Sequence, residues 1–211
     1  MVFFINKNMK DIKNKRIILA SNSPRRKEIL EKEGIVFDVY VPKGVEYDIV
    51  GKPYSKDLVN ECARRKAENA YNEIKKKDNI DELIIVACDT VVVKDNIIIG
   101  KPKERNEAQD ILKSLSGKEH IVSSSICIMT DDRCLVDNEE TKIRFRELSE
   151  EDISGYIDRC MPFDKAGSYG IQDEGFDFVV KIDGNIDNVI GFPKETFYKM
   201  LKMIEENNYD K

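Results

Sequence analysis

Short unbroken hydrophobic runs and longer helical repeats follow one another along the first part of the chain. The run at 17–19 predicts a buried strand, and Ser23 followed by Pro24 predicts a helix that begins at Pro24. Gly34 ends this helical pattern and suits a left-handed helix cap. Another unbroken run at 83–87 predicts a strand that is buried on both faces and ends there.

The other elements are predicted from the same two kinds of pattern. Strands are expected at 36–41, 91–93, 97–99, 121–129, 134–145 and 176–182, and helices are expected to begin at Ser55, after Pro102, at Ser149 and at Pro193. The two long strands at 121–129 and 134–145 are predicted to be antiparallel neighbours. The short strands at 91–93 and 97–99 form a hairpin, and a polar loop punctuated by glycines lies at 162–172.

Two adjacent arginines, Arg25 and Arg26, fall in the first turn of the helix predicted at Pro24. The positive end of the helix dipole disfavours cations there, so their presence indicates a nearby anion. The free N–H groups of that turn, the hydroxyls of Ser21 and Ser23 and the two guanidinium groups together make a cradle for phosphate. The alternative is that both arginines extend into solvent, because exposed charges near a helix end cost only about 0.3–1 kcal/mol.

Lys66 is a third cation in an unusual position. A rotation of about 100° per residue places it in the apolar stripe of the helix that begins at Ser55. Either its stem packs while the ammonium reaches water at the edge of the stripe, or the ammonium points at an anion. Lys101, in a Gly-Lys-Pro turn, is a further candidate. These cations indicate a polyphosphate ligand, and spacing alone takes the interpretation no further.

Asp89 is predicted to follow directly on a deeply buried strand, where carboxylates are rare unless something compensates them. A hard cation or a water to be activated is one such partner. With Glu46 or Asp48 from the turn-rich loop before Ser55, Asp89 offers the oxygen ligands that Mg²⁺ prefers and usually shares with phosphates. The alternative is that Asp89 accepts hydrogen bonds from neighbouring backbone N–H groups.

Composition and charge narrow the class of protein. The net charge of −5 argues against a protein that coats nucleic acid or an anionic membrane, since such partners attract broad basic surfaces. No stretch approaches the roughly 18 apolar residues that span a bilayer, and we interpret residues 1–15 as an N-terminal extension rather than a signal peptide. The five cysteines are odd in number and lack CxxC spacing, which favours a reducing cytosol.

Several familiar catalytic signatures are missing from the sequence. The single histidine, His120, rules out a multi-histidine zinc site, and its place at the start of a strand predicts a structural role. The sequence contains no GxSxG, GxxxxGKS/T or GxGxxG motif. The candidate chemistry therefore rests on the cations and on Asp89.

Five motifs stand in a fixed order along the chain. They are 19–26 (LASNSPRR), 88–92 (CDTVV), 101–102 (KP), 115–117 (LSG) and 165–172 (KAGSYGIQ). Together they resemble the motifs of the Maf family of nucleoside triphosphate pyrophosphatases. The resemblance runs from about Arg16 to the final helix and includes 188–193 (NVIGFP).

The resemblance implies an α/β fold, with an elongated mixed β-sheet flanked by helices and two lobes around a central cleft. Residues 16–207 would form this single domain after the extension at 1–15. The implied activity is cytoplasmic hydrolysis of a nucleoside triphosphate to the monophosphate and pyrophosphate, with Mg²⁺ or another divalent metal such as Mn²⁺. No nucleic acid or membrane partner is implied, and a homodimer is compatible with this interpretation.

The resemblance also assigns roles to individual residues. Asp89 matches the family's proton acceptor and, with Glu46, its metal site. The triphosphate-handling positions of the family are matched by Ser21, Arg25, Arg26, Lys66 and Lys101. Thr90 and Gln172 match the branch that acts on dTTP and UTP, for which close analogues such as 5-methyl-UTP are also expected to fit.

Two positions depart from the family pattern. Tyr47 follows Glu46 where a second acid is usual, which leaves Glu46 and Asp48 as alternative metal ligands, and Met161 replaces the usual glutamate before Pro162. We expect altered metal affinity rather than lost activity. The alternatives to a dTTP/UTP pyrophosphatase are a pyrophosphatase of the 7-methyl-GTP branch, a catalytically weak nucleotide-binding regulator and a nucleic-acid-binding protein that uses the helix of Arg25 and Arg26.

Overall fold

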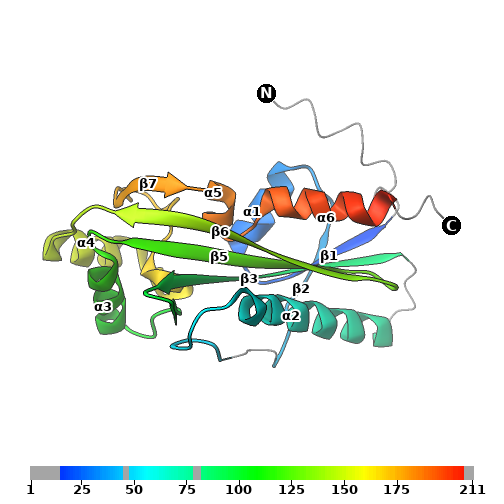
Figure 1. Cartoon of the computed structure of the whole chain (residues 1–211). Helices are drawn as coiled ribbons and strands as arrows, with labels where there is room; N and C mark the ends of the chain where they lie inside the picture. The colour runs from blue at the N-terminus through cyan, green and yellow to red at the C-terminus, as the bar shows by residue number, and fades with distance from the viewer. Residues whose placement is uncertain (1–14, 45–47, 78–81, 207–211) are drawn as a thin grey trace.

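A mixed sheet of seven strands runs through the described part of the chain (Figure 1). The structure is a computed structural model that describes residues 15–44, 48–77 and 82–206. The strand order is β2-β1-β3-β5-β6-β7, and β4 pairs with β3 off this path. The strands are β1 (Arg16–Ala20), β2 (Asp38–Tyr40), β3 (Leu83–Lys94), β4 (Ile97–Ile99), β5 (Glu119–Met129), β6 (Cys134–Phe145) and β7 (Val179–Asp183).

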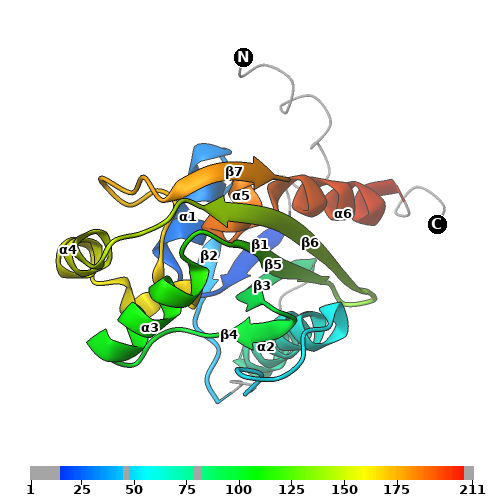
Figure 2. The ribbon, with the colours of Figure 1, turned by 60° about the vertical axis from the view of Figure 1, so that its left-hand side comes forward.

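Helices pack on both faces of the sheet (Figures 1 and 2). They are α1 (Pro24–Lys32), α2 (Lys56–Lys77), α3 (Arg105–Leu115), α4 (Glu150–Cys160), α5 (Ile186–Ile190) and α6 (Lys194–Glu206), with short 3-10 turns η2 (Pro162–Asp164) and η3 (Ala166–Ser168). Helices α1 and α6 pack on one face of β1 and β3, and α2 packs on the other. Helices α3 and α4 pack at the far end of the elongated sheet.

The α/β fold class and most predicted elements are confirmed. Helix α1 begins at Pro24, Gly34 has the positive φ of 71° that suits a helix cap, and β5 and β6 are antiparallel neighbours. Of the predicted extension at 1–15, only Lys15 falls within the described residues. No helix in the described ranges combines the length and the apolar character that crossing a membrane requires.

The prediction that a strand ends at residue 87 is wrong. Strand β3 continues to Lys94, so Asp89 and Thr90 lie in the middle of the strand rather than after it. The polar pair interrupts the hydrophobic run without interrupting the strand, because β5 places Ser125 opposite Asp89 and Ser124 opposite Thr90. Polar side chains therefore face polar side chains across this part of the sheet.

Three smaller differences concern the ends of the sheet and a missed helix. Strand β2 is limited to Asp38–Tyr40 rather than 36–41, because it is an edge strand that pairs with β1 over three residues. Strand β7 begins at Val179 rather than 176, since Phe176 and Phe178 turn into an aromatic cluster instead. Helix α5 was not predicted, because five residues are too few for a helical repeat to be recognised.

One stretch of β3 has an open edge. Strand β1 pairs with β3 only as far as Val86, and β4 begins to pair at Val92. Between them, residues 87–91 of β3 have no strand partner on this side, within the described part of the chain. Successive side chains of a strand point to opposite faces of the sheet. Side chains from both faces can therefore reach this gap in the pairing.

Candidate active site

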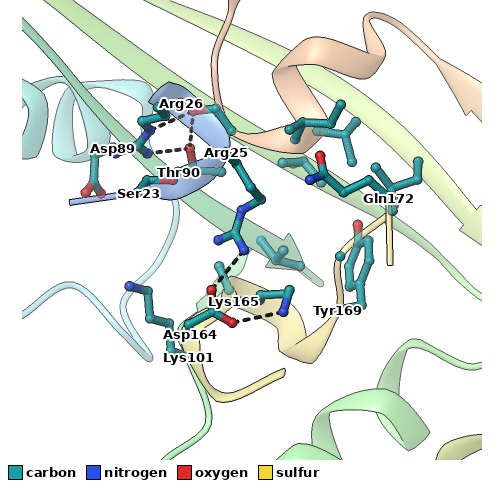
Figure 3. A pocket seen from close by; sticks show the side chains of 18 of the residues that line it. Ser23, Arg25, Arg26, Asp89, Thr90, Lys101, Asp164, Lys165, Tyr169 and Gln172 are labelled. Atoms are coloured by element: carbon teal, nitrogen blue, oxygen red, sulfur yellow. Dashed lines mark hydrogen bonds and ion pairs between the residues drawn. The ribbon is translucent and has the colours of Figure 1, made fainter. Parts of the chain in front are cut away.

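A pocket lies at the open edge of β3 (Figure 3). Its lining comes from the start of α1, from α2, β3 and β5, from the turn before α3, from the loop at 162–172 and from the end of α5. The charged side chains that line it are five cations, Arg25, Arg26, Lys66, Lys101 and Lys165, and two carboxylates, Asp89 and Asp164. A strongly cationic pocket in a chain of net charge −5 is suited to an anionic ligand.

Arg26 fills the open edge with hydrogen bonds, as the dashed lines in Figure 3 show in part. Its Nη1 donates to the carbonyl of Cys88 at 2.9 Å and to Ser21 Oγ at 3.1 Å. Its Nη2 donates to Thr90 Oγ1 at 3.1 Å, and its Nε donates to the carbonyl of Gly191 at 2.9 Å. We call these five residues the Arg26 network. Four of the five N–H groups of the guanidinium are thus bonded within the protein, so this arginine does not extend into solvent.

Helix α5 supports the Arg26 network from behind. The Oγ1 of Thr90 lies 2.9 Å from Ser124 Oγ, which donates in turn to the carbonyl of the buried Asn188 on α5. The helix ends at Gly191, whose φ of 111° strongly favours glycine, and this turn presents the carbonyl that Arg26 meets. The sequence signal for α5 is the pair of its ends, Asn185 as the N-cap and Gly191 as the C-cap.

Lys66 and Asp89 form an ion pair across the open edge. Asp89 lies on the face of β3 that packs on α2, and Lys66 Nζ contacts Asp89 Oδ1. Lys66 therefore meets an anion of this chain, and the charge that compensates the carboxylate is a lysine rather than a backbone N–H group. Burial raises the pKa of the neighbouring thiols of Cys62 and Cys88 to about 11, so neither is a thiolate nucleophile at neutral pH.

A second carboxylate, Asp164, bridges two cations on the opposite wall of the pocket. Arg25 Nη1 lies 2.9 Å from Asp164 Oδ2, and Lys165 Nζ lies 2.9 Å from Asp164 Oδ1. Although burial by itself raises the pKa of Asp164, the hydrogen bonds from Lys165 and Arg25 outweigh it and lower the pKa below its ordinary value. We call Arg25, Asp164 and Lys165 the Asp164 bridge.

A buried aromatic cluster underlies the loop at 162–172. His120 Nε2 lies 2.7 Å from the Tyr169 hydroxyl, and the ring of Tyr169 stacks on Phe176 with centroids 5.5 Å apart. The His120 ring also meets Phe145 edge-on at 4.8 Å. Burial lowers the pKa of His120 to about 4, so the imidazole is neutral at physiological pH. The structural role predicted for His120 is confirmed.

Most of the predicted site residues line this one pocket. They are Arg25, Arg26, Lys66, Asp89, Thr90, Lys101 and Gln172. Ser21 lies behind the pocket, where its hydroxyl accepts from Arg26, and Ser23 lines the pocket instead. In Figure 3, Asp89 and Gln172 lie at opposite ends of the pocket, with Arg25 between them.

Only part of the predicted metal site lies within the described residues. Glu46 lies outside the described residues, and Asp48 is described but exposed and not part of the pocket lining. Across the ranges that the structure describes, no group of three or more His, Cys, Asp or Glu residues could hold a metal ion by itself. Asp89 is therefore the one predicted metal ligand that the structure places in the pocket.

Two charged residues of the pocket were not predicted as site residues, Asp164 and Lys165. Both belong to the polar loop at 162–172, but adjacent opposite charges are common on protein surfaces and gave no reason to single them out. The available signal was that Lys165 is the first residue of the motif at 165–172 (KAGSYGIQ).

Comparison with known proteins gives consistent results. A family profile described as "Maf-like protein" matches residues 16–204. A protein of Thermotoga maritima named "dTTP/UTP pyrophosphatase" is 44% identical over 186 residues, 88% of this chain and 88% of the relative. Proteins of the same name from Aquifex aeolicus (39% identical, 89% of this chain, 94% of the relative) and Bacillus cereus (40%, 89% and 89%) are also similar. The matched region contains every residue that lines the pocket.

Proposed function

This chain belongs to the Maf family, and from that premise we propose that it hydrolyses dTTP and UTP to the monophosphate and pyrophosphate. The observation that carries the proposal is that five cations and Asp89 line one pocket at the open edge of β3. A triphosphate has the charge and the length to engage several of these cations at once. Close analogues such as 5-methyl-UTP are expected to be substrates too.

In the proposed reaction, Asp89 takes a proton from a water molecule that attacks the α-phosphorus. The new bond forms between that oxygen and phosphorus, the α–β phosphoanhydride bond breaks, and pyrophosphate leaves. Arg25, Lys66 and Lys101 hold the phosphates and stabilise the charge that develops on their oxygens. Lys66 also contacts Asp89 and so orients the carboxylate.

Arg26 acts in this proposal as a positioning residue rather than as a main phosphate ligand. It bonds the carbonyl of Cys88 and the hydroxyl of Thr90, the two residues on either side of Asp89. Holding both neighbours fixes the backbone that carries the carboxylate. One N–H group of the five is left beyond the four protein contacts, and it is available to a phosphate oxygen.

We propose that Gln172 recognises the base at the far end of the pocket from Asp89. Its amide offers a donor and an acceptor, which suits the imide edge of uracil or thymine. Gln172 is exposed at the pocket mouth, where a base can reach it. The hydroxyl of Thr90 is bonded to Arg26 and Ser124, so we propose that Thr90 influences the base through the position of β3.

The proposal includes a divalent metal, Mg²⁺ by preference and Mn²⁺ as a substitute. Mg²⁺ is usually held by one or two carboxylates together with substrate phosphates, so Asp89, one of the two carboxylates that line the pocket, fits such a metal. When bound, the metal would neutralise charge on the phosphates. Glu46 is the second candidate ligand.

We also propose a cytoplasmic location. None of the five cysteines is in a disulfide, and the thiols of Cys127 and Cys134 meet in a hydrogen bond of 3.7 Å. Free thiols in this number are typical of a reducing compartment.

The experiment that tests the proposal is a panel of triphosphates assayed for pyrophosphate release with and without Mg²⁺. The panel contains dTTP, UTP, 5-methyl-UTP, CTP, GTP and 7-methyl-GTP. Release from dTTP, UTP and 5-methyl-UTP above CTP, GTP and 7-methyl-GTP supports the proposal. A preference for 7-methyl-GTP indicates the other branch of the family, and binding of UTP without release of pyrophosphate indicates a regulator.

A further inference from the structure

In the Asp164 bridge, one carboxylate lies between two cations of the pocket that come from different elements. Arg25 comes from α1, and Lys165 follows η2 on the opposite wall. Each oxygen of Asp164 meets one of them at 2.9 Å (Figure 3). A phosphate group has the same charge sign and the same ability to meet two cations with two oxygens.

We propose that Asp164 stands in for a phosphate group and that a bound nucleotide replaces it, so that Arg25 and Lys165 move from the carboxylate to a phosphate of the substrate. Lys165 is then a substrate-binding residue in addition to the predicted ones, and Asp164 is an internal competitor of the substrate. The proposal rests on the proposed function, since it takes a triphosphate or pyrophosphate to be the ligand.

The exposure of the three side chains favours this exchange. The side chain of Asp164 is 55% exposed, whereas those of Arg25 and Lys165 are 20% and 12% exposed. The carboxylate can therefore turn into solvent at little cost, while the two cations stay in the pocket and each lose one anionic partner. A phosphate, with more charge and more acceptor oxygens than a carboxylate, satisfies them better.

Lys165 is held in place independently of Asp164. Its Nζ also lies 3.6 Å from Asp173 Oδ2, and Asp173 accepts a hydrogen bond of 2.5 Å from the Tyr156 hydroxyl. Tyr156 is fully buried, so this second carboxylate is fixed to the core. Loss of Asp164 therefore leaves Lys165 positioned at the pocket rather than free to turn away.

The test measures the affinity for inorganic pyrophosphate by calorimetry, in the absence of turnover. Asp164→Asn keeps the shape of the side chain and removes its charge, and we expect pyrophosphate to bind about two- to fivefold more tightly. The matched control is Asp158→Asn, which removes an exposed carboxylate paired with Arg105 outside the pocket and should leave the affinity unchanged. Unchanged or weaker binding by Asp164→Asn overturns the proposal, because it would make Asp164 a tether between the walls rather than a competitor.

Lys165→Gln tests the other half of the proposal. We expect it to weaken pyrophosphate binding about fivefold or more, and unchanged affinity overturns the role of Lys165. In the Lys165→Gln background, Asp164→Asn should give a smaller gain than in the wild type, since one of the two released cations is gone.

These results are separable from the proposed function. If UTP is hydrolysed but Asp164→Asn gains no affinity, the exchange fails and the proposed function stands. If no triphosphate is hydrolysed but Asp164→Asn binds pyrophosphate more tightly, the exchange stands as an anion-binding property and the proposed function fails. Pyrophosphate that binds none of the variants contradicts the exchange.

Discussion

The two walls of the pocket hold adjacent arginines in opposite ways. On the β3 wall, Arg26 donates to two carbonyls and two hydroxyls that belong to the sheet, to α5 and to the turn after β1. On the wall formed by the loop at 162–172, Arg25 meets the exposed carboxylate of Asp164. A carbonyl cannot leave its partner without deforming the backbone, whereas an exposed carboxylate can. Residue type alone therefore does not decide whether a cation near a phosphate site binds the ligand or holds the protein.

The largest effect is expected from substitution of Asp89, the proposed proton acceptor on the β3 wall. Asp89→Asn should lower kcat for UTP by about 10²-fold or more, equivalent to about 3 kcal/mol or more, because the amide cannot accept the proton of the attacking water. Pyrophosphate affinity should change far less. The matched control is Asp95→Asn, an exposed carboxylate near the end of the same strand and outside the pocket. Turnover by Asp89→Asn at the wild-type rate contradicts the role of Asp89.

A pH titration tests whether the buried aromatic cluster around His120, beneath the loop at 162–172, excludes water. The pKa of His120 is lowered to about 4 in the folded protein, while the unfolded chain has an ordinary value near 6.5. Between these values the unfolded chain binds a proton that the folded protein does not, so the free energy of unfolding falls as the pH drops from 6.5 to 4, by about 3 kcal/mol.

The measurement is direct because His120 is the single histidine of the chain. Its imidazole signal in NMR spectra should titrate near pH 4, and denaturant unfolding of His120→Asn should lose this part of the pH dependence. An imidazole that titrates near 6.5 in the folded protein would show that the aromatic cluster admits water.

Paired substitutions of the two arginines sharpen the comparison of the walls. Arg26→Gln should lower the free energy of unfolding by about 2 kcal/mol, because it removes the guanidinium donors to the carbonyls of Cys88 and Gly191. It should also lower kcat more than it changes KM. Arg25→Gln should do the opposite, with a higher KM and little loss of stability. Equal effects of the two variants on stability and KM would remove the distinction between the walls.

The smallest effect concerns the base. Gln172→Ala should raise KM for UTP about fivefold, equivalent to about 1 kcal/mol, through the loss of hydrogen bonds to the base. The discrimination between UTP and CTP should fall with it. Glu174→Ala, an exposed residue just beyond the pocket lining, is the control on the same segment. A variant with unchanged discrimination would place base recognition elsewhere.

The sequence was sufficient for some of these features and insufficient for others. Helical periodicity alone placed Lys66 in an apolar stripe, and its contact with Asp89 is the kind of partner that position required. Alternating and unbroken hydrophobic runs gave the long strands and most helices. The break in the run at Asp89 and Thr90 was misleading, because the pattern of one strand does not say what the neighbouring strand places opposite it.

The Arg26 network could not be predicted, for a physical reason. Its acceptors at Cys88 and Gly191 are backbone carbonyls that lie 62 and 165 residues away along the chain, and any residue type provides a carbonyl. The Cys88 carbonyl becomes available because β1 is short and leaves part of β3 without a strand partner, and the Gly191 carbonyl lies at the end of α5. The open edge of β3 follows from the topology of the sheet, which the pattern of a single strand does not reveal. Glu46, the second predicted metal ligand, stays a prediction.

The gap along β3 has a consequence for how copies of this protein behave toward one another. A bare stretch of strand edge is where foreign strands add on, and such additions lead to aggregation. Here the Cys88 carbonyl accepts from the charged guanidinium of Arg26, which no incoming strand displaces without burying that charge. The shortness of β1 thus makes room for the pocket, and the Arg26 guanidinium occupies a backbone acceptor that an added strand would need.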